Sequence, residues 1–156
     1  MYSKSPWTKG LIISSVVVTI LIVAVLIYMC YIAATNAKMS YFWFLFAIVT
    51  LTLLWAVVVA PRGVSVDEKG NITIHLLACT IRIAKEHIVK ITPFPSNRGT
   101  IRLIGSGGLY GYMGLFKNAG IGTFSSYATD FDKSFVIYRK NKRPIVVTVA
   151  DSSIFK

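Results

Sequence analysis

Two long runs without a charged residue constrain this chain more than any other feature. Residues 11–37 and residues 39–61 contain no Asp, Glu, Lys or Arg. A helix needs about 20 mostly apolar residues to cross a bilayer core about 30 Å thick, and both runs meet that length. Neither run has a polar stripe at helical spacing, which argues against an amphipathic surface helix. The sequence therefore predicts two transmembrane helices, near residues 11–33 and 41–60.

The first run has one alternative interpretation, a cleaved signal peptide with Lys4 and Lys9 as its basic flank. The apolar core of a signal peptide is only about 7–15 residues long, and a second apolar run follows here at once. Both runs are also rich in Val and Ile, which favour strands in soluble proteins. Because a single segment in a bilayer must satisfy its own backbone hydrogen bonds, run length outweighs this preference and favours a helical hairpin.

The basic residues predict how this hairpin is oriented. Of the 17 Lys and Arg, Lys4 and Lys9 precede the first run and Lys38 lies in the connector, while all others follow the second run. Cytoplasmic flanks of membrane helices carry an excess of Lys and Arg. We therefore expect a multi-pass protein of the cell membrane, with both termini in the cytoplasm and the connector outside. The formal net charge of +11 also favours contact with anionic lipid head groups.

The chain changes character after residue 61, where short runs of β-branched and aromatic residues alternate with Gly, Pro, Asn and Asp. Strands at this spacing predict an all-β domain, a small antiparallel barrel or sandwich, over residues 62–156. Pro93 and Pro95 exclude a central strand just before them. The expected strands are residues 63–67, 72–77, 80–84, 89–92, 100–104, 120–129, 135–139 and 145–150, with one helical turn at 85–88 and a short capping helix at 151–156.

Residues 104–116 (IGSGGLYGYMGLF) carry the most specific pattern in the chain. Five glycines alternate there with apolar and aromatic side chains: Gly105, Gly107, Gly108, Gly111 and Gly114. Together with Arg102 and residues 125–130 and 145–155, this pattern resembles the bacterial pleckstrin-homology-like (PH-like) domains, which often follow two N-terminal membrane spans. The resemblance covers residues 62–156. It implies a bent seven-stranded barrel with a C-terminal helix, here unusually short, and no catalytic residues.

The glycine-rich segment permits three interpretations. A phosphate-binding loop would require a Gly-Lys-Ser/Thr sequence or a third spaced glycine, and neither is present. A bend in a barrel would use the glycines for positive φ and close backbone approach. A partner or lipid contact would use the apolar side chains, which are too numerous for a solvated loop. The candidate contact residues are Leu109, Tyr110, Tyr112, Met113, Phe116 and Lys117.

No constellation of residues indicates catalysis. His75 and His87 are isolated from carboxylates at ligand spacing, so the sequence predicts no metal site. The acidic pairs lie at turns, where Asp serves the backbone, and no Ser, Cys or Lys lies in a nucleophile motif. We therefore expect neither enzymatic activity nor a cofactor. Five basic residues around two turns are candidates for contact with an anionic surface: Arg98, Arg102, Lys140, Lys142 and Arg143.

These features favour a non-enzymatic, membrane-anchored PH-like scaffold that docks protein partners or self-associates at the cytoplasmic surface of the membrane. Exposed strand edges invite the pairing that a homo-oligomer would need. The alternative is a sensor of anionic lipid head groups that uses the basic turns and the glycine-aromatic segment. Because tethering keeps the domain at the bilayer, we expect lipid as a partner and no nucleic acid.

Overall fold

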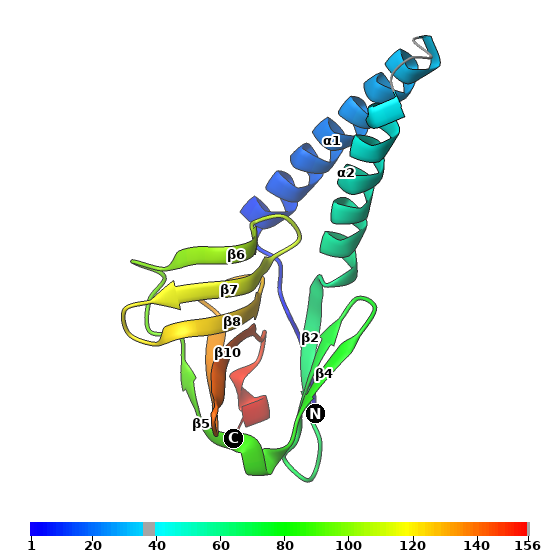
Figure 1. The fold of residues 1–156 in the computed structure, drawn as a ribbon. Helices are drawn as coiled ribbons and strands as arrows, with labels where there is room; N and C mark the ends of the chain where they lie inside the picture. Colours follow the sequence, from blue (N-terminus) through cyan, green and yellow to red (C-terminus); the bar gives the residue numbers. More distant parts are fainter. Residues whose placement is uncertain (36–39, 156) are drawn as a thin grey trace.

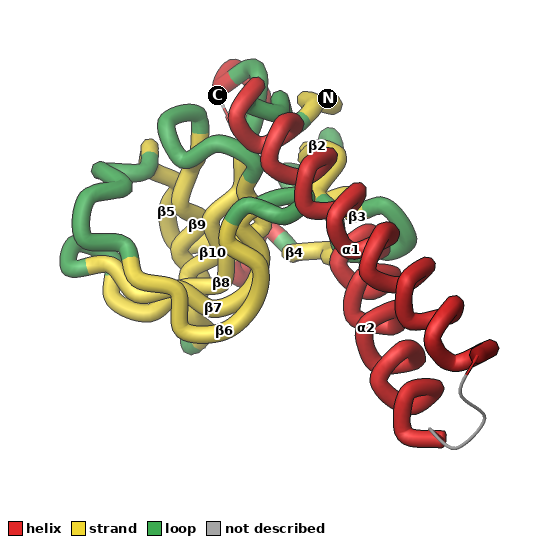
Figure 2. Tube along the Cα trace, turned by 90° about the horizontal axis from the view of Figure 1, so that it is seen from above, coloured by secondary structure: helices red, strands yellow, loops and turns green. Residues whose placement is uncertain are grey.

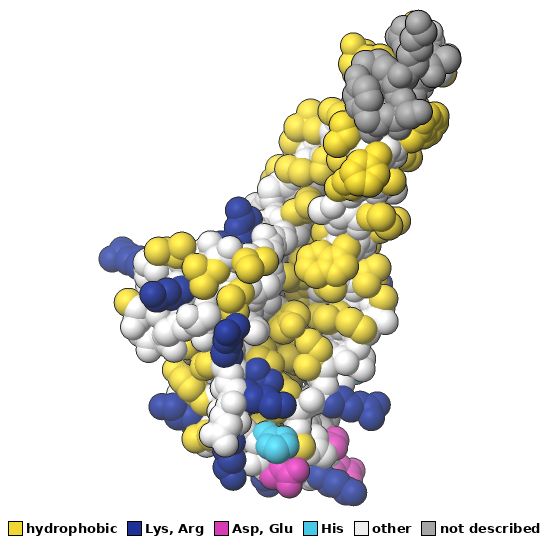
Figure 3. Space-filling model, viewed as in Figure 1, with side chains coloured by type: hydrophobic (Ala, Val, Ile, Leu, Met, Phe, Trp, Pro, Cys, Tyr) yellow, Lys and Arg dark blue, Asp and Glu magenta, His cyan; other side chains and the backbone are white. Residues whose placement is uncertain are grey.

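Two apolar helices extend from one side of a β domain in the computed structural model, which describes residues 1–35 and 40–155 (Figure 1). Helix α1 spans Lys9–Thr35 and helix α2 spans Ser40–Val58. Most of the predicted connector, including Lys38, lies outside the described residues. Both predicted helices are present, and apolar side chains cover most of their visible surface in Figure 3.

The two helices differ in length. Within the described residues, one helix is long and apolar enough to cross a bilayer, over Lys9–Ile32. The apolar part of α2, Trp43–Val58, is shorter. At 1.5 Å per residue, α1 is about 40 Å long and α2 about 28 Å, against a bilayer core of about 30 Å. The structure thus contains an apolar N-terminal helix that could serve as an anchor, and the second span stays a prediction.

The β domain consists of two sheets joined by the short 3-10 helix η1 (Lys85–His87). The first sheet is antiparallel and contains, in spatial order, β1 (Tyr2–Lys4), β2 (Pro61–Val66), β3 (Ile72–Leu76) and β4 (Thr80–Ile83). The second contains β5 (Ile88–Pro93), β9 (Ser134–Arg139), β10 (Lys142–Thr148), β8 (Gly122–Ala128), β7 (Tyr112–Asn118) and β6 (Ile101–Gly107). Strands β8 and β10 are parallel, and all other neighbours are antiparallel.

In the part of the chain that the structure describes, the two sheets do not pair with each other, so the expected barrel is not closed. Closure into one barrel would need two ladders, one across η1 between β4 and β5 and one between β6 and β1. The three residues of η1 instead separate β4 from β5, and the second sheet curls from β5 round to β6 (Figure 2). Strand β5, which ends at Pro93, is an edge strand, as the prolines predict.

The expected C-terminal capping helix is also different in the structure. Residues Ser152–Phe155 form a single 3-10 turn, η2, which is too short for the i to i−4 hydrogen bonds of an α-helix. The turn still closes one end of the core, because Ile154 is buried and the Phe155 ring lies 5.3 Å from that of Phe135.

Strand β1 is a feature that the sequence did not predict. It pairs with β2, with Ser3 opposite Val64. The hydroxyl of Ser3 accepts hydrogen bonds of 3.0 Å from the backbone N–H groups of Ala150 and Asp151. The residues before α1 thus belong to the β domain, and the helical hairpin is an insertion between two neighbouring strands.

Two hydrophobic clusters stabilise the β domain. One lies between the sheets and joins Val64 and Ile74 of the first to Ile137 and Val147 of the second. The other lies on the opposite face of the second sheet and is aromatic: Phe116, Phe124 and Phe131, with Phe94 packed against it. The Phe94 and Phe131 rings are stacked at 5.0 Å. Alternating strand residues therefore face two cores, which anchors both faces of the larger sheet.

The glycine-rich segment, expected as a loop or bend, forms most of the β6–β7 hairpin. Gly105 lies directly opposite Gly114, and both have positive φ, +116° and +123°. A Cβ atom at either position would collide with a backbone carbonyl of the other strand, of Met113 or of Ile104. The interpretation as a bend is thus confirmed, since only glycine permits this close crossing of the two strands.

Candidate functional site

The tip of the β6–β7 hairpin is hydrogen-bonded to the first turns of α1. The Ser14 hydroxyl lies 3.1 Å from the Gly108 carbonyl, a bond that it shares with the Leu11 carbonyl of its own helix at the same distance, and the Ser15 hydroxyl accepts from the Tyr110 N–H (2.9 Å). The Thr19 and Tyr110 hydroxyls lie 2.7 Å apart. We call this set of three bonds the clamp. It holds the backbone of Tyr110 at φ +57°, a value that residues other than glycine rarely adopt.

The segment before α1 adds further attachments between helix and β domain. The Ser5 hydroxyl donates to the Thr148 carbonyl (2.7 Å), and the Thr129 hydroxyl donates to the Pro6 carbonyl (2.6 Å). The Trp7 ring meets Tyr110 edge-on at 6.4 Å. Together with the clamp, these contacts tie α1 to the β domain along its N-terminal turns.

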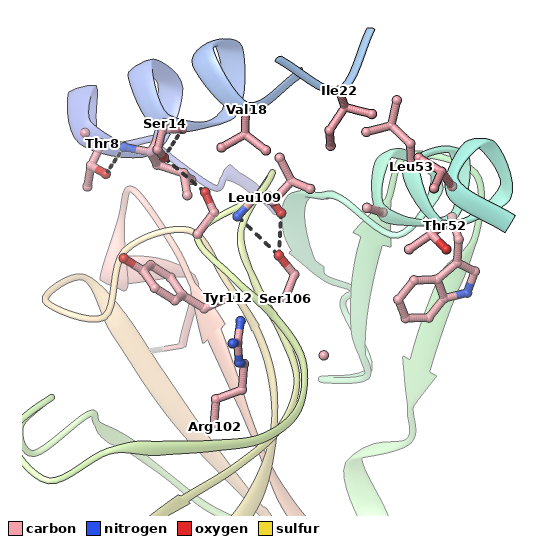
Figure 4. A pocket seen from close by; sticks show the side chains of 18 of the residues that line it. Thr8, Ser14, Val18, Ile22, Thr52, Leu53, Arg102, Ser106, Leu109 and Tyr112 are labelled. Atoms are coloured by element: carbon pink, nitrogen blue, oxygen red, sulfur yellow. Dashed lines mark hydrogen bonds between the residues drawn. The ribbon is translucent and has the colours of Figure 1, made fainter. Parts of the chain in front are cut away.

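A groove of about 910 Å³ lies between the two helices and the hairpin (Figure 4). Val18 and Ile22 of α1 line one side, Leu53 of α2 another, and Leu109 and Tyr112 of the hairpin a third. Most of the lining surface is apolar. A pocket of this size lies within the range of roughly 300–1,000 Å³ that is typical of small-ligand sites.

Three of the hydroxyls that line the groove are engaged inside the protein. The Ser106 hydroxyl bonds both the carbonyl and the N–H of Leu109, and the Thr8 hydroxyl accepts from the Leu11 N–H. The Thr52 hydroxyl donates to the Ile48 carbonyl of its own helix. Arg102 is the charged residue of the lining, and within the described part of the chain it makes no ion pair.

The Arg102 side chain lies along β6, over the backbone of Gly107. A Cβ atom at Gly107 would lie 2.9 Å from Nη1 of Arg102. Gly107 therefore leaves the space that the guanidinium occupies. In Figure 4 Arg102 reaches from the β-domain side of the groove toward Ser106 and Tyr112. This places a positive charge beside an otherwise apolar surface.

The contact residues predicted from the glycine-rich segment have several different positions. Met113 and Phe116 are only 2% and 3% exposed, so both fill the interior and are not available to a partner. The Tyr112 ring packs 4.7 Å from that of Phe131, although it also lines the groove. Tyr110 belongs to the clamp and Leu109 to the groove, while Lys117 is exposed on β7.

The five predicted basic residues do not form one surface. Arg102 lies on β6, which Figure 1 shows on the side of the domain from which the helices extend, and Arg98 lies in the segment just before this strand. Lys140, Lys142 and Arg143 lie at the β9–β10 turn, where the Lys140 N–H bonds the carbonyl of His87 in η1 (2.9 Å). This turn and η1 lie at the opposite end of the domain. We call these two ends the proximal and the distal end.

Two other features of the site were missed by reading the sequence. Ser14, Ser15 and Thr19 dock the hairpin, and their signal was three hydroxyls close together in an otherwise aliphatic run. Edge strand β6 exposes Ile101, Leu103 and Ile104, the last of them 72% exposed. An apolar edge of this kind is typical of a contact surface.

Each of the two histidines lies close to a neighbouring polar side chain. The His75 Nε2 atom lies 2.8 Å from the Ser65 hydroxyl, and the His75 ring packs edge-on against Tyr2. His87 lies beside Glu86 in η1. The described residues contain no group of three His, Cys, Asp or Glu side chains that could hold a metal ion.

Comparison with known proteins assigns the β domain. A family model described as a bacterial PH domain matches residues 63–156, which is more than half of the chain. Neither a curated protein nor a solved structure matches. The matched region begins in β2 and runs through both sheets, the hairpin and η2. The chain belongs to the bacterial PH domain family.

Proposed function

We propose that this protein is a non-catalytic scaffold that α1 and α2 anchor in the membrane and that holds its PH domain in one fixed posture at the bilayer surface. The clamp carries this proposal. A freely tethered domain would need only a flexible linker, whereas here Ser14, Ser15 and Thr19 of α1 bond the hairpin tip directly. A binding role without catalysis also fits the family.

The lengths of the helices support this posture. Helix α1, at about 40 Å, exceeds the bilayer core by about 10 Å, or roughly seven residues. If the excess lies at its N-terminal end, Ser14 and Ser15 reach the bilayer interface and the hairpin tip lies among the head groups. Trp7 and Trp55, both near the β domain, suit such an interface. Helix α2, at about 28 Å, then crosses the same core with little tilt.

The charges support an orientation with both termini in the cytoplasm. Lys4, Lys9 and Arg62 all lie at the end of the helices that adjoins the β domain. In this orientation the distal end, with Lys140, Lys142 and Arg143, points away from the membrane. A protein partner with an acidic surface is the occupant that this exposed basic turn suits.

Cysteine accessibility tests the anchoring. In a C30A/C79S background, we expect Asn141→Cys to react with a membrane-impermeant thiol reagent only after the cells are opened. Asn36→Cys, in the connector, should react in intact cells. Reaction of Asn141→Cys in intact cells together with protection of Asn36→Cys would invert the orientation. Extraction of the protein by alkaline carbonate would contradict anchoring altogether.

A second candidate function, sensing of anionic lipid head groups, is favoured by the proximal end. Arg98 and Arg102 lie there beside the exposed apolar edge of β6. Each basic residue near an anionic leaflet contributes about 1 kcal/mol of attraction. If the domain senses lipid, a fluorophore at Lys117→Cys should respond to added phosphatidylglycerol in nanodiscs, and R98Q/R102Q should abolish the response.

A further inference from the structure

We infer that the groove between α1, α2 and the β6–β7 hairpin is a binding site for one anionic phospholipid, with an acyl chain between the helices and the phosphate at Arg102. The inference rests on the membrane anchoring proposed above. It goes beyond that proposal, because a scaffold could be anchored by its helices without holding any particular lipid.

The lining of the groove suits an amphipathic ligand, with a long apolar part and a charged part. Val18, Ile22 and Leu53 form an apolar surface that extends along both helices. From Gly10 to Ile22 the lining covers about 18 Å of α1, at 1.5 Å per residue. A compact polar metabolite would leave most of this surface uncovered. A long apolar chain in the membrane-facing part of the groove covers it.

Arg102, the charged residue of the lining, indicates the polar part of the ligand. The hydroxyls of Thr8, Ser106 and Thr52 already have partners inside the protein. Arg102 is left with its guanidinium donors free of any carboxylate in the described residues. A guanidinium binds a phosphate by two parallel hydrogen bonds. A zwitterionic phospholipid also offers a phosphate, but its ammonium group cancels the charge, whereas an anionic phospholipid leaves a net negative charge opposite Arg102. The complementary ligand is therefore an anionic phospholipid.

Trp55 provides a natural probe, because it lines the groove. The experiment uses the full chain in nanodiscs, with W7F and W43F leaving Trp55 as the single tryptophan. Its fluorescence is quenched by brominated acyl chains, supplied either on phosphatidylglycerol or on phosphatidylcholine at equal mole fraction. Lipids around the outside of the helices quench Trp55 in both cases. The excess quenching by phosphatidylglycerol therefore reports the groove.

We expect a preference of roughly fivefold for phosphatidylglycerol, the ratio that one favourable basic residue near the surface supplies. Arg102→Gln should remove this preference. The matched control is Arg98→Gln, which removes an exposed charge at the same end of the domain but outside the groove lining, and should leave the preference intact. Equal quenching by the two lipids in the protein with Arg102 would overturn the inference, as would equal loss in both variants.

A second single-tryptophan protein, with W7F and W55F, separates this inference from the proposed anchoring. Its Trp43 lies at the other end of α2 and is exposed. Quenching of Trp43 without quenching of Trp55 would mean that the helices are in the bilayer and that protein, such as a second copy, fills the groove. That result overturns the lipid site alone. If neither tryptophan is quenched, the anchoring itself fails.

Discussion

The bond between Ser15 and Tyr110 gives the sharpest test of the clamp. Ser15 is only 2% exposed, and its hydroxyl is the acceptor for the Tyr110 N–H at 2.9 Å. Ser15→Ala removes this acceptor without weakening α1, because alanine has the higher helix propensity. A buried N–H without a partner costs about 1–3 kcal/mol. Tyr110 keeps its contacts with Thr19 and Trp7, so the loss should stay local.

Hydrogen exchange of the full chain in nanodiscs measures this loss directly. A cost of about 1–3 kcal/mol corresponds to about 5- to 150-fold faster exchange at the hairpin tip, in peptides that cover residues 106–112. Thr52→Ala is the matched control, because it removes a hydroxyl whose bond stays within α2. Unchanged exchange at the tip in Ser15→Ala, or an equal increase in Thr52→Ala, would refute the clamp.

Three further predictions concern single interactions. In a double-mutant cycle of Thr19→Val with Tyr110→Phe, the 2.7 Å hydroxyl pair should give a coupling free energy of about 0.5–1.5 kcal/mol, and additive losses would exclude the bond. Gly114→Ala should lower the melting temperature more than Gly108→Ala, because a Cβ atom at Gly114 meets the backbone of β6 whereas nothing lies within 4 Å at Gly108; equal shifts would contradict the close crossing. Hydrogen bonds from Asn71 hold the pKa of Asp67 below its ordinary 3.8, so the stability that the carboxylate contributes is present above that value and is lost as the pH falls through the lower folded pKa. An NMR titration should show the Asp67 pKa returning toward 3.8 in Asn71→Ala, and an unchanged pKa would contradict this cause.

The local pattern of the sequence predicted most strands of the β domain. Alternation and turn residues placed β2, β3, β4 and β9 within a few residues of their observed bounds. Strand β7 was missed, because Gly114 interrupts its run of apolar and aromatic side chains. Strand β1 was missed for another reason. Its three residues carry no pattern, and only the long-range pairing with β2 defines them.

The candidate site could be predicted only in part. The sequence singled out Arg102, Leu109 and Tyr110, which the structure places around the groove and clamp. It could not show that Met113 faces the core, since the side-chain direction depends on the register of β6 against β7. It also grouped Arg102 with Lys140, although the two lie at opposite ends of the domain. Which residues lie close together in space depends on how the strands are arranged, and a local sequence pattern does not contain this information.

The depth of the two ends of the β domain tests the fixed posture most directly. In the C30A/C79S background, a fluorophore is attached at Ile104→Cys on β6 or at Asn141→Cys in the β9–β10 turn, and the full chain is placed in nanodiscs with head-group-labelled quencher lipids. The fixed posture predicts strong quenching at residue 104 and little at residue 141. Equal quenching at the two positions would mean that the domain swings freely, and would contradict the account.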